Sequence, residues 1–387
     1  MQSSRHFEGT EPSFSRRTFL YVAGAAAVSA AAAGALSGCS GGQASEQKQS
    51  EPEEPRTREV TDQVGNTIEV PAKLENVIIT SWKGAMEAFM VLGHEDLIKG
   101  MSDTSRYAWL RTVYPDLKDI PDYGNFDDVN AEEIVKAEPD IVFAPQAGAK
   151  GIEKMQSLNL PVYVDGISTK GDPYEGRDDE LMAIAEIVGE EDRANDFLAW
   201  EEKWLKEVAD RVANVAEADK KTALCLRNNT TEIFNCKNIL GKTVENAGGV
   251  NVAKDAGIEK FYGDVSAEEI VKWDPDFIFQ YTVSGTLEGN VARYQEMRDD
   301  SRFSGMKALE SGDFYLMPHA IANWGGKMES ALGALVMGKV MYPELFSDID
   351  IKSVAEDYYE KFLDRKLTSE DWATIARTAT GAKDLPL

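Results

Sequence analysis

Cysteine and histidine are both scarce in this chain, which has three residues of each among 387. Three cysteines are too few for a disulfide scaffold, and three histidines argue against a zinc site built from several imidazoles. Basic residues are outnumbered as well, because 41 Lys and Arg stand against 67 Asp and Glu, for a formal net charge of −26. Nucleic acids and anionic lipid surfaces both attract basic proteins, so the sequence disfavours both classes of partner.

The remaining composition is that of an ordinary soluble protein. Hydrophobic residues make up 43% of the chain and charged residues 28%, which is typical of globular domains and not of disordered or multi-spanning chains. At about 100–200 residues per domain, the length predicts two domains, each large enough to bury a core.

An uncharged stretch runs from Leu20 to Leu36 near the N-terminus, and nine of its seventeen residues are Ala. Together with the preceding Arg16-Arg17 it predicts a secretory signal over residues 1–38. The paired arginines look like the twin-arginine type, with the general secretory route as the alternative. The stretch ends in Leu36-Ser37-Gly38-Cys39, which resembles a lipoprotein box with Cys39 as the lipidated residue; a plain anchor helix is the alternative. Residues 39–56 are polar and aperiodic, and are expected to form a flexible tether.

A repeat divides the rest of the chain into two lobes. The segment from Asn130 to Phe143 recurs 136 residues later, from Ser266 to Phe279, with nine of fourteen positions identical. In each copy the first residue is a predicted N-cap, with Glu133 or Glu269 completing a capping box. A proline then ends the helix, and a short apolar run predicts a strand buried on both faces. The chain is therefore expected to be α/β, with a helix-to-parallel-strand unit in each lobe.

Further apolar runs at 76–80, 161–164 and 222–226 predict strands of the same kind. Between the lobes, apolar residues at three- and four-residue spacing predict a helical spine over 178–215, uninterrupted from Glu191 to Val215. The N-terminal lobe is thus placed at 57–177 and the C-terminal lobe at 216–387. One stiff helix between the lobes predicts only slight closure on a ligand, because wide hinge bending needs loop residues.

Cys225 and Cys236 flank a polar turn between two strand-like runs. Outside the cell a cross-strand disulfide could join them, and two independent buried thiols are the equal alternative.

Several short motifs in a fixed order carry a family resemblance over residues 57–365. Around the spine and behind a lipoprotein signal, they resemble the substrate-binding lipoproteins of ABC importers, in the long-helix class that serves iron–siderophore, haem and cobalamin uptake. This resemblance implies two Rossmann-like lobes joined by one long helix, the class III periplasmic binding protein fold. Besides the repeat, the motifs are Val60-Thr61-Asp62-Gln63-Val64-Gly65-Asn66, Val70-Pro71-Ala72, Ala247-Gly248-Gly249-Val250-Asn251-Val252 and Tyr342-Pro343-Glu344-Leu345-Phe346.

The resemblance also implies a docking role for one exposed glutamate on each lobe, which would enter an arginine pocket of the permease. The matching positions are Glu132 and Glu268, and their duplicate placement favours docking. The alternative is local, since each is followed four residues later by a lysine, Lys136 or Lys272, and such a pair stabilises a helix by about 0.2–0.5 kcal/mol.

The ligand is expected between the lobes, where the carboxyl ends of the strands face each other. A cationic and aromatic cluster lies between residues 106 and 114; arginine suits oxyanions, and aromatic faces suit a planar chelate. Trp109 and Tyr114 could instead anchor a short helix. The candidate ligand-binding residues are Trp82, Arg106, Tyr107, Arg111, Gln146, Arg227, Asn228, Tyr281, His319 and Trp324.

A metal chelate, first of all a ferric siderophore, is the ligand that we expect, ahead of haem, cobalamin and molybdate or tungstate. The sequence has no catalytic constellation, so the chain is not expected to be an enzyme or to hold a cofactor of its own. An ABC permease with its ATPase is the expected partner, and the outer face of the cytoplasmic membrane the expected location. A chelatase-like enzyme and a surface receptor on the same frame are the alternative classes.

Overall fold

The computed structural model of this chain describes residues 56–80, 84–102, 104, 114, 117, 119–166, 173–258, 260, 262–281, 287–376 and 383–387. The predicted signal, Cys39 and nearly all of the predicted tether lie outside these residues. No helix in the described part of the chain is both long and apolar enough to cross a membrane. The described residues belong to one compact unit, Glu54–Leu387.

The N-terminal lobe is built on a parallel four-stranded sheet in the order β4-β3-β7-β8. Its central strands are short, apolar and wholly buried, which confirms the expectation from the sequence. The elements are β1 (Thr57–Thr61), β2 (Thr67–Pro71), β3 (Val77–Ile79), α1 (Gly84–Val91), η1 (Glu95–Leu97), β4 (Ile98–Met101), β5 (Gly124–Asn125), β6 (Asp128–Val129), α3 (Ala131–Lys136), β7 (Ile141–Pro145), α4 (Ala149–Ser157) and β8 (Val162–Asp165).

An antiparallel hairpin of β1 and β2 is attached to the outer strand of this sheet. The buried carboxylate of Asp62 accepts hydrogen bonds from the backbone N–H of Asn66 at 2.7 Å, inside the hairpin, and of Val164 at 3.2 Å, on β8. One acidic side chain therefore stabilises the hairpin turn and also accepts a hydrogen bond from a backbone N–H of the edge strand β8, which would otherwise be unpaired.

The C-terminal lobe has a mixed six-stranded sheet in the order β12-β10-β9-β13-β14, with β11 also paired to β9. Strands β9, β11, β13 and β14 are parallel, whereas β10 pairs antiparallel with both of its neighbours, β9 and β12. The elements are η4 (Glu217–Asp219), β9 (Thr222–Leu226), β10 (Glu232–Phe234), α7 (Ile239–Asn246), β11 (Val250–Asn251), β12 (Tyr262–Asp264), α8 (Ala267–Trp273), β13 (Phe277–Gln280), α9 (Leu287–Asp299), η5 (Ser301–Phe303), α10 (Lys307–Ser311), β14 (Phe314–Leu316), η6 (Lys327–Glu329), α11 (Ser330–Met341), α12 (Ile351–Phe362) and α13 (Ser369–Ala376).

Both copies of the repeat form the predicted helix and strand, α3 with β7 and α8 with β13. Their caps differ, however. Ser266 accepts a hydrogen bond from the N–H of Glu269 at 3.1 Å, as predicted. Asn130 makes no side-chain cap, and its own N–H donates to the carbonyl of Tyr123. The capping box predicted for the first copy is therefore wrong, because the preceding loop already takes the donor that Glu133 would have satisfied.

The predicted continuous spine is two helices, α5 (Pro173–Val188) and α6 (Glu191–Val212). The break falls at Gly189, whose φ of +79° is the left-handed conformation in which helices commonly end. The N–H groups of Gly189 and Glu190 both donate to the carbonyl of Ala185 and close the end of α5. The uninterrupted helix α6 has 22 residues, about 33 Å at 1.5 Å per residue.

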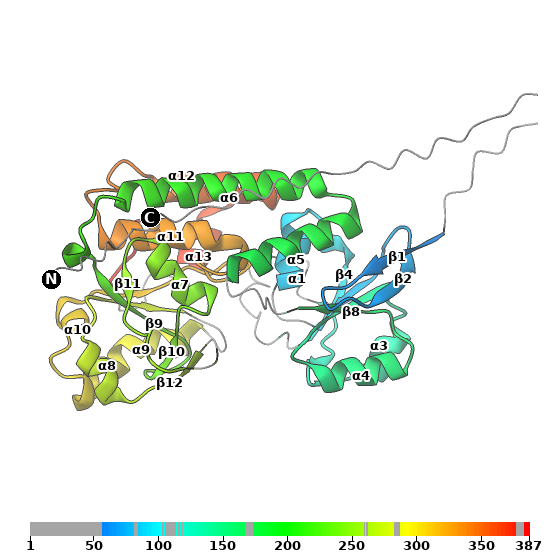
Figure 1. Cartoon of the computed structure of the whole chain (residues 1–387), viewed down its shortest axis with the longest axis horizontal. Coiled ribbons are helices and arrows are strands. Elements are labelled where there is room, and N and C mark those ends of the chain that lie inside the picture. The colour runs from blue at the N-terminus through cyan, green and yellow to red at the C-terminus, as the bar shows by residue number, and fades with distance from the viewer. Residues whose placement is uncertain are drawn as a thin grey trace, which may run out of the picture. The chain divides into compact units, whose positions relative to one another are not determined.

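Helix α6 lies side by side with α12 (Figure 1), and aromatic rings fill the contact between them. Phe197 and Trp200 of α6 meet Tyr358 and Phe362 of α12 at ring-centroid distances of 5.2–6.4 Å. Arg193, in the first turn of α6, donates to the carbonyls of Val91 at the end of α1 and of Phe362 at the end of α12. The connection between the lobes is therefore a packed group of helices.

Cys225 and Cys236 are both free thiols. Cys225 is wholly buried in β9, with its thiol directed at the carbonyl of Leu240, and Cys236 is half-buried beyond β10. Burial raises the pKa of the Cys225 thiol well above its ordinary value and that of Cys236 to about 12. Of the two alternatives left open by the sequence, the structure contains the independent thiols.

Candidate functional site

The carboxyl ends of the parallel strands form one edge of each sheet, here called its carboxyl edge. In the N-terminal lobe this edge carries Thr80 after β3, Ser102 after β4, Gln146 after β7 and Asp165 at the end of β8. The hydroxyl of Thr80 donates to the carbonyl of Phe143 at 3.0 Å. Ser102 is buried, and its Oγ has no hydrogen-bond partner in the described part of the chain. Gln146 is exposed at this edge, as a ligand-contacting residue must be.

In the C-terminal lobe the carboxyl edge begins with Arg227, directly after β9. Its guanidinium donates to both carboxylate oxygens of Glu232 at 2.8 Å and lies 3.9 Å from the ring centre of Tyr262. Asn228 follows it in the polar turn, half-buried. Arg227 is thus placed where the sequence predicted it, but its charge is already balanced.

Tyr281, His319 and Trp324 belong to the core of the C-terminal lobe. All three side chains are buried. The hydroxyl of Tyr281 donates to the carbonyl of Leu240 at 3.3 Å, and the indole N–H of Trp324 donates to the hydroxyl of Tyr359 at 3.0 Å. The prediction that these side chains line a ligand surface does not fit their burial. Trp324 in particular packs against Trp372 inside the lobe, whereas the sequence analysis placed it among the ligand-binding residues.

Four predicted ligand-binding residues, Trp82, Arg106, Tyr107 and Arg111, lie outside the described residues. They belong to the segments that follow β3 and β4 in the chain.

The sequence analysis missed a group of charged residues where the two lobes meet, here called the junction cluster: Glu87 on α1, Glu180 on α5 and Lys327 on η6. The ammonium of Lys327 lies 2.5 Å from Glu180, and Glu87 accepts a hydrogen bond from the N–H of Met328 at 3.2 Å. Lys327 also lies directly against Gly84, the first residue of α1, where any Cβ atom would collide with the ammonium. The loop after β14 of one lobe therefore reaches the helix after β3 of the other.

A buried ion pair lies next to the junction cluster and holds the main chain of Lys327. Arg177 on α5 pairs with Glu201 on α6, and both side chains are 3% exposed. Arg177 also donates to the carbonyl of Lys327 at 3.0 Å and to the hydroxyl of Ser330 at 2.9 Å, while Ser330 donates to Glu201. Burial raises the pKa of Glu201, and Arg177 and Ser330 act in the opposite direction. Two helices of the connection thus hold η6 through its main chain.

Potential metal ligands do not gather in the described part of the chain. No group of three or more His, Cys, Asp or Glu side chains there is arranged to hold a metal ion.

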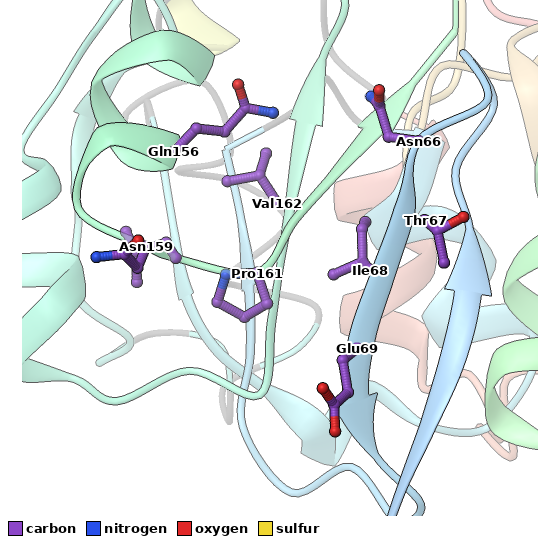
Figure 2. A pocket seen from close by; sticks show the side chains of 9 residues that line it. Asn66, Thr67, Ile68, Glu69, Gln156, Asn159, Pro161 and Val162 are labelled. Atoms are coloured by element: carbon purple, nitrogen blue, oxygen red, sulfur yellow. The ribbon is translucent and has the colours of Figure 1, made fainter.

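Two surface hollows lie away from both carboxyl edges. Figure 2 shows the first, of about 380 Å³, between β2 and the segment that leads from α4 into β8. The second, of about 630 Å³, is lined by residues that precede β3 and β4 and by the end of α5. Both hollows therefore open at the amino ends of the strands, where α/β proteins do not usually bind ligands.

Glu132 and Glu268 are exposed on the first turns of α3 and α8, at equivalent positions of the repeat. Their local partners differ from the expected ones. Lys136 and Lys272 pair with Glu133 and Glu269 instead, whereas Glu132 pairs with Lys154 of α4 at 3.2 Å. In the described part of the chain, the two lysines thus make their ion pairs with Glu133 and Glu269 and not with Glu132 and Glu268.

The sequence pattern of the periplasmic binding protein family matches residues 77–320, which include both sheets. The chain belongs to this family. Its fold, two α/β lobes joined by helices, is the predicted one. As a family member it is a solute-binding component of an ABC importer, working outside the cytoplasm.

Three relatives are informative for this binding protein. The molybdate-binding protein MolA of Haemophilus influenzae is 25% identical over 79% of this chain and 90% of its own length. Its solved structure with molybdate has a TM-score of 0.70 at 22% identity, covering 80% of this chain and 99% of that one. The iron-uptake system-binding protein of Bacillus subtilis is 24% identical over 52% of this chain and 64% of its own length. A periplasmic solute-binding protein of Veillonella parvula shares the fold, with a TM-score of 0.70 at 22% identity over 82% of this chain and 96% of that one.

The buried ion pair predicts unequal effects for the two acidic partners of Arg177. Replacing Glu201 by leucine leaves the guanidinium buried without its main counter-charge, and should lower the free energy of unfolding by about 3–5 kcal/mol. Replacing Asp178, whose side chain is 41% exposed, by alanine should cost no more than about 1 kcal/mol. Urea unfolding of both variants measures the difference, and equal losses would show that burial of the pair is unimportant.

Proposed function

We propose that this binding protein captures an anionic, metal-containing solute at the carboxyl edges of its two lobes and passes it to a membrane permease. The observation that carries the proposal is Lys327, a partly exposed cation of the C-terminal lobe that lies against the first residue of α1 in the N-terminal lobe. A cation at this position can meet a solute that touches both lobes. The sequence adds Lys83, Arg106 and Arg111 in the segments that follow β3 and β4.

Among the solutes considered, we favour two. A ferric siderophore fits the cationic and aromatic residues at 106–114, because arginines suit the anionic oxygens of the chelate and aromatic faces suit its apolar surface. The iron-uptake relative agrees with this choice. Molybdate is the second candidate, and the extent of the similarity to MolA favours it. In both cases the metal arrives with its own oxygen ligands, so the protein does not need a metal-binding cluster.

We further propose that the chain is exported through its twin-arginine signal and held at the membrane by a lipid on Cys39. The tether of residues 39–56 would then allow the two lobes to reach solute and permease in turn.

A thermal-unfolding panel tests the proposed ligand class. The full-length chain with Cys39→Ala, which prevents lipidation, is heated with a ferric siderophore, haem, molybdate, tungstate, cobalamin or a bare divalent cation. A solute at 100 times its dissociation constant stabilises a protein by about 2.7 kcal/mol, so one of the anionic metal compounds should raise the melting temperature by several degrees. A shift with cobalamin or with Zn²⁺ or Mn²⁺ alone would contradict the proposal.

Glu132 and Glu268 are proposed to meet arginines of the permease. The double variant Glu132→Lys with Glu268→Lys should bind its solute with unchanged affinity and should lose at least about tenfold in uptake, because like charges across an interface cost several kcal/mol. Solute titration and transport assays measure the two effects separately.

The matched control for docking is Glu202→Lys with Glu360→Lys. These residues are exposed on α6 and α12, so the control has the same change in net charge on other helices. It should transport normally. Equal uptake by the two double variants would show that Glu132 and Glu268 are ordinary surface residues.

A further inference from the structure

Lys327 brings a cation of the C-terminal lobe into an acidic part of the N-terminal lobe. Its single hydrogen-bond partner in the described part of the chain is Glu180, on α5. Burial alone would lower the pKa of Lys327, but the carboxyl groups of Glu180, Glu87 and Asp165 outweigh it and raise the pKa. Lys327 is therefore a charged side chain held across the junction by carboxyl groups of the N-terminal lobe and of the connecting helix α5.

The two members of this ion pair differ in the exposure of their side chains. The side chain of Lys327 is 35% exposed, whereas that of Glu180 is 7% exposed. An ammonium has three donors, and Glu180 takes one of them, so two remain for water or for a solute. Lys327, the more exposed member of the pair and the cationic one, is thus the member that could bind an anion.

Arg227, the basic residue at the other carboxyl edge, provides an internal comparison. Its guanidinium is bound by both oxygens of Glu232, stacked on Tyr262 and only 13% exposed. Releasing it would break several contacts at once. Releasing Lys327 from Glu180 breaks one hydrogen-bonded ion pair.

We propose that Lys327 is an exchangeable contact of the binding site, which leaves Glu180 for an anionic oxygen of the solute when the solute binds. This inference rests on the proposed anionic ligand, and it adds that a carboxylate of the protein competes with that ligand. The carboxylate of Glu180 and the solute then compete for the same ammonium. Lys327 belongs to the C-terminal lobe, whereas Glu180 belongs to α5, the connecting helix that packs against α1 of the N-terminal lobe. The exchange therefore also replaces a direct contact across the junction by a contact through the solute.

If the two groups compete in this way, replacing Lys327 and replacing Glu180 should change the affinity for the solute in opposite directions. Lys327→Met removes the cation and should weaken binding by about tenfold or more, the usual effect of losing a charge-assisted hydrogen bond. Glu180→Gln keeps the size of the side chain but removes the competing charge, so it should strengthen binding by a few-fold. A residue pair that only stabilises the fold would not give shifts of opposite sign.

The experiment titrates the full-length chain with Cys39→Ala, and its two junction variants, with molybdate and with a ferric tris-catecholate chelate by calorimetry. Asp364→Asn is the matched control. It removes the carboxylate that pairs with Arg193, a side chain 26% exposed, in another ion pair between distant parts of the chain, α6 and the segment after α12. The control should leave the dissociation constant unchanged. If Glu180→Gln fails to fold, Glu180→Asp weakens the pair by shortening the acid and should strengthen binding in the same direction.

Each result decides a separate point. Opposite shifts for Lys327→Met and Glu180→Gln support the exchange. Unchanged affinity, or weaker binding in both variants, overturns the exchange while leaving the anionic ligand in place. If the Cys39→Ala chain with an unaltered junction binds neither probe, the proposed ligand class is contradicted, and the exchange is contradicted as well.

Discussion

The buried ion pair between Arg177 and Glu201 is the contact on which the arrangement of the two lobes depends. Two such charges are stable inside a protein only when further hydrogen bonds complete them, and here the hydroxyl of Ser330 and the carbonyl of Lys327 do so. The pair joins α5 to α6 and fixes the main chain of η6 between them. The side chain of Lys327 is therefore presented to the N-terminal lobe from a rigid support.

The lobes themselves were largely predictable from the sequence, because their signals are local. The repeat carries its own helix start, proline stop and apolar strand, and β9 begins and ends where the apolar run at 222–226 does. The break at Gly189 was less visible, since the apolar spacing of the spine continues on both sides. A glycine between two helical patterns is the signal that could have revealed it.

The site was less predictable, because its contacts are distant in sequence and its side chains can turn either way. Glu180 and Lys327 are 147 positions apart, and neither belongs to a motif. Tyr281 and Trp324 follow strand ends, as ligand-contacting residues often do, yet they turn into the core, where their polar atoms find partners. Position along a strand predicts the edge of the sheet but not the direction of the side chain.

The central claim is that the junction holds both lobes as one body, so that a solute meets a preformed pair of carboxyl edges. Distances between spin labels at exposed positions on α4 and α8 test it most directly, using Lys150→Cys and Lys272→Cys in a chain whose three native cysteines are replaced by alanine. We expect one narrow distance distribution, which solute shifts only slightly and Glu201→Leu broadens, with Asp178→Ala as the unaffected control. A broad distribution in the otherwise unaltered chain, or a narrow one in Glu201→Leu, would contradict the account.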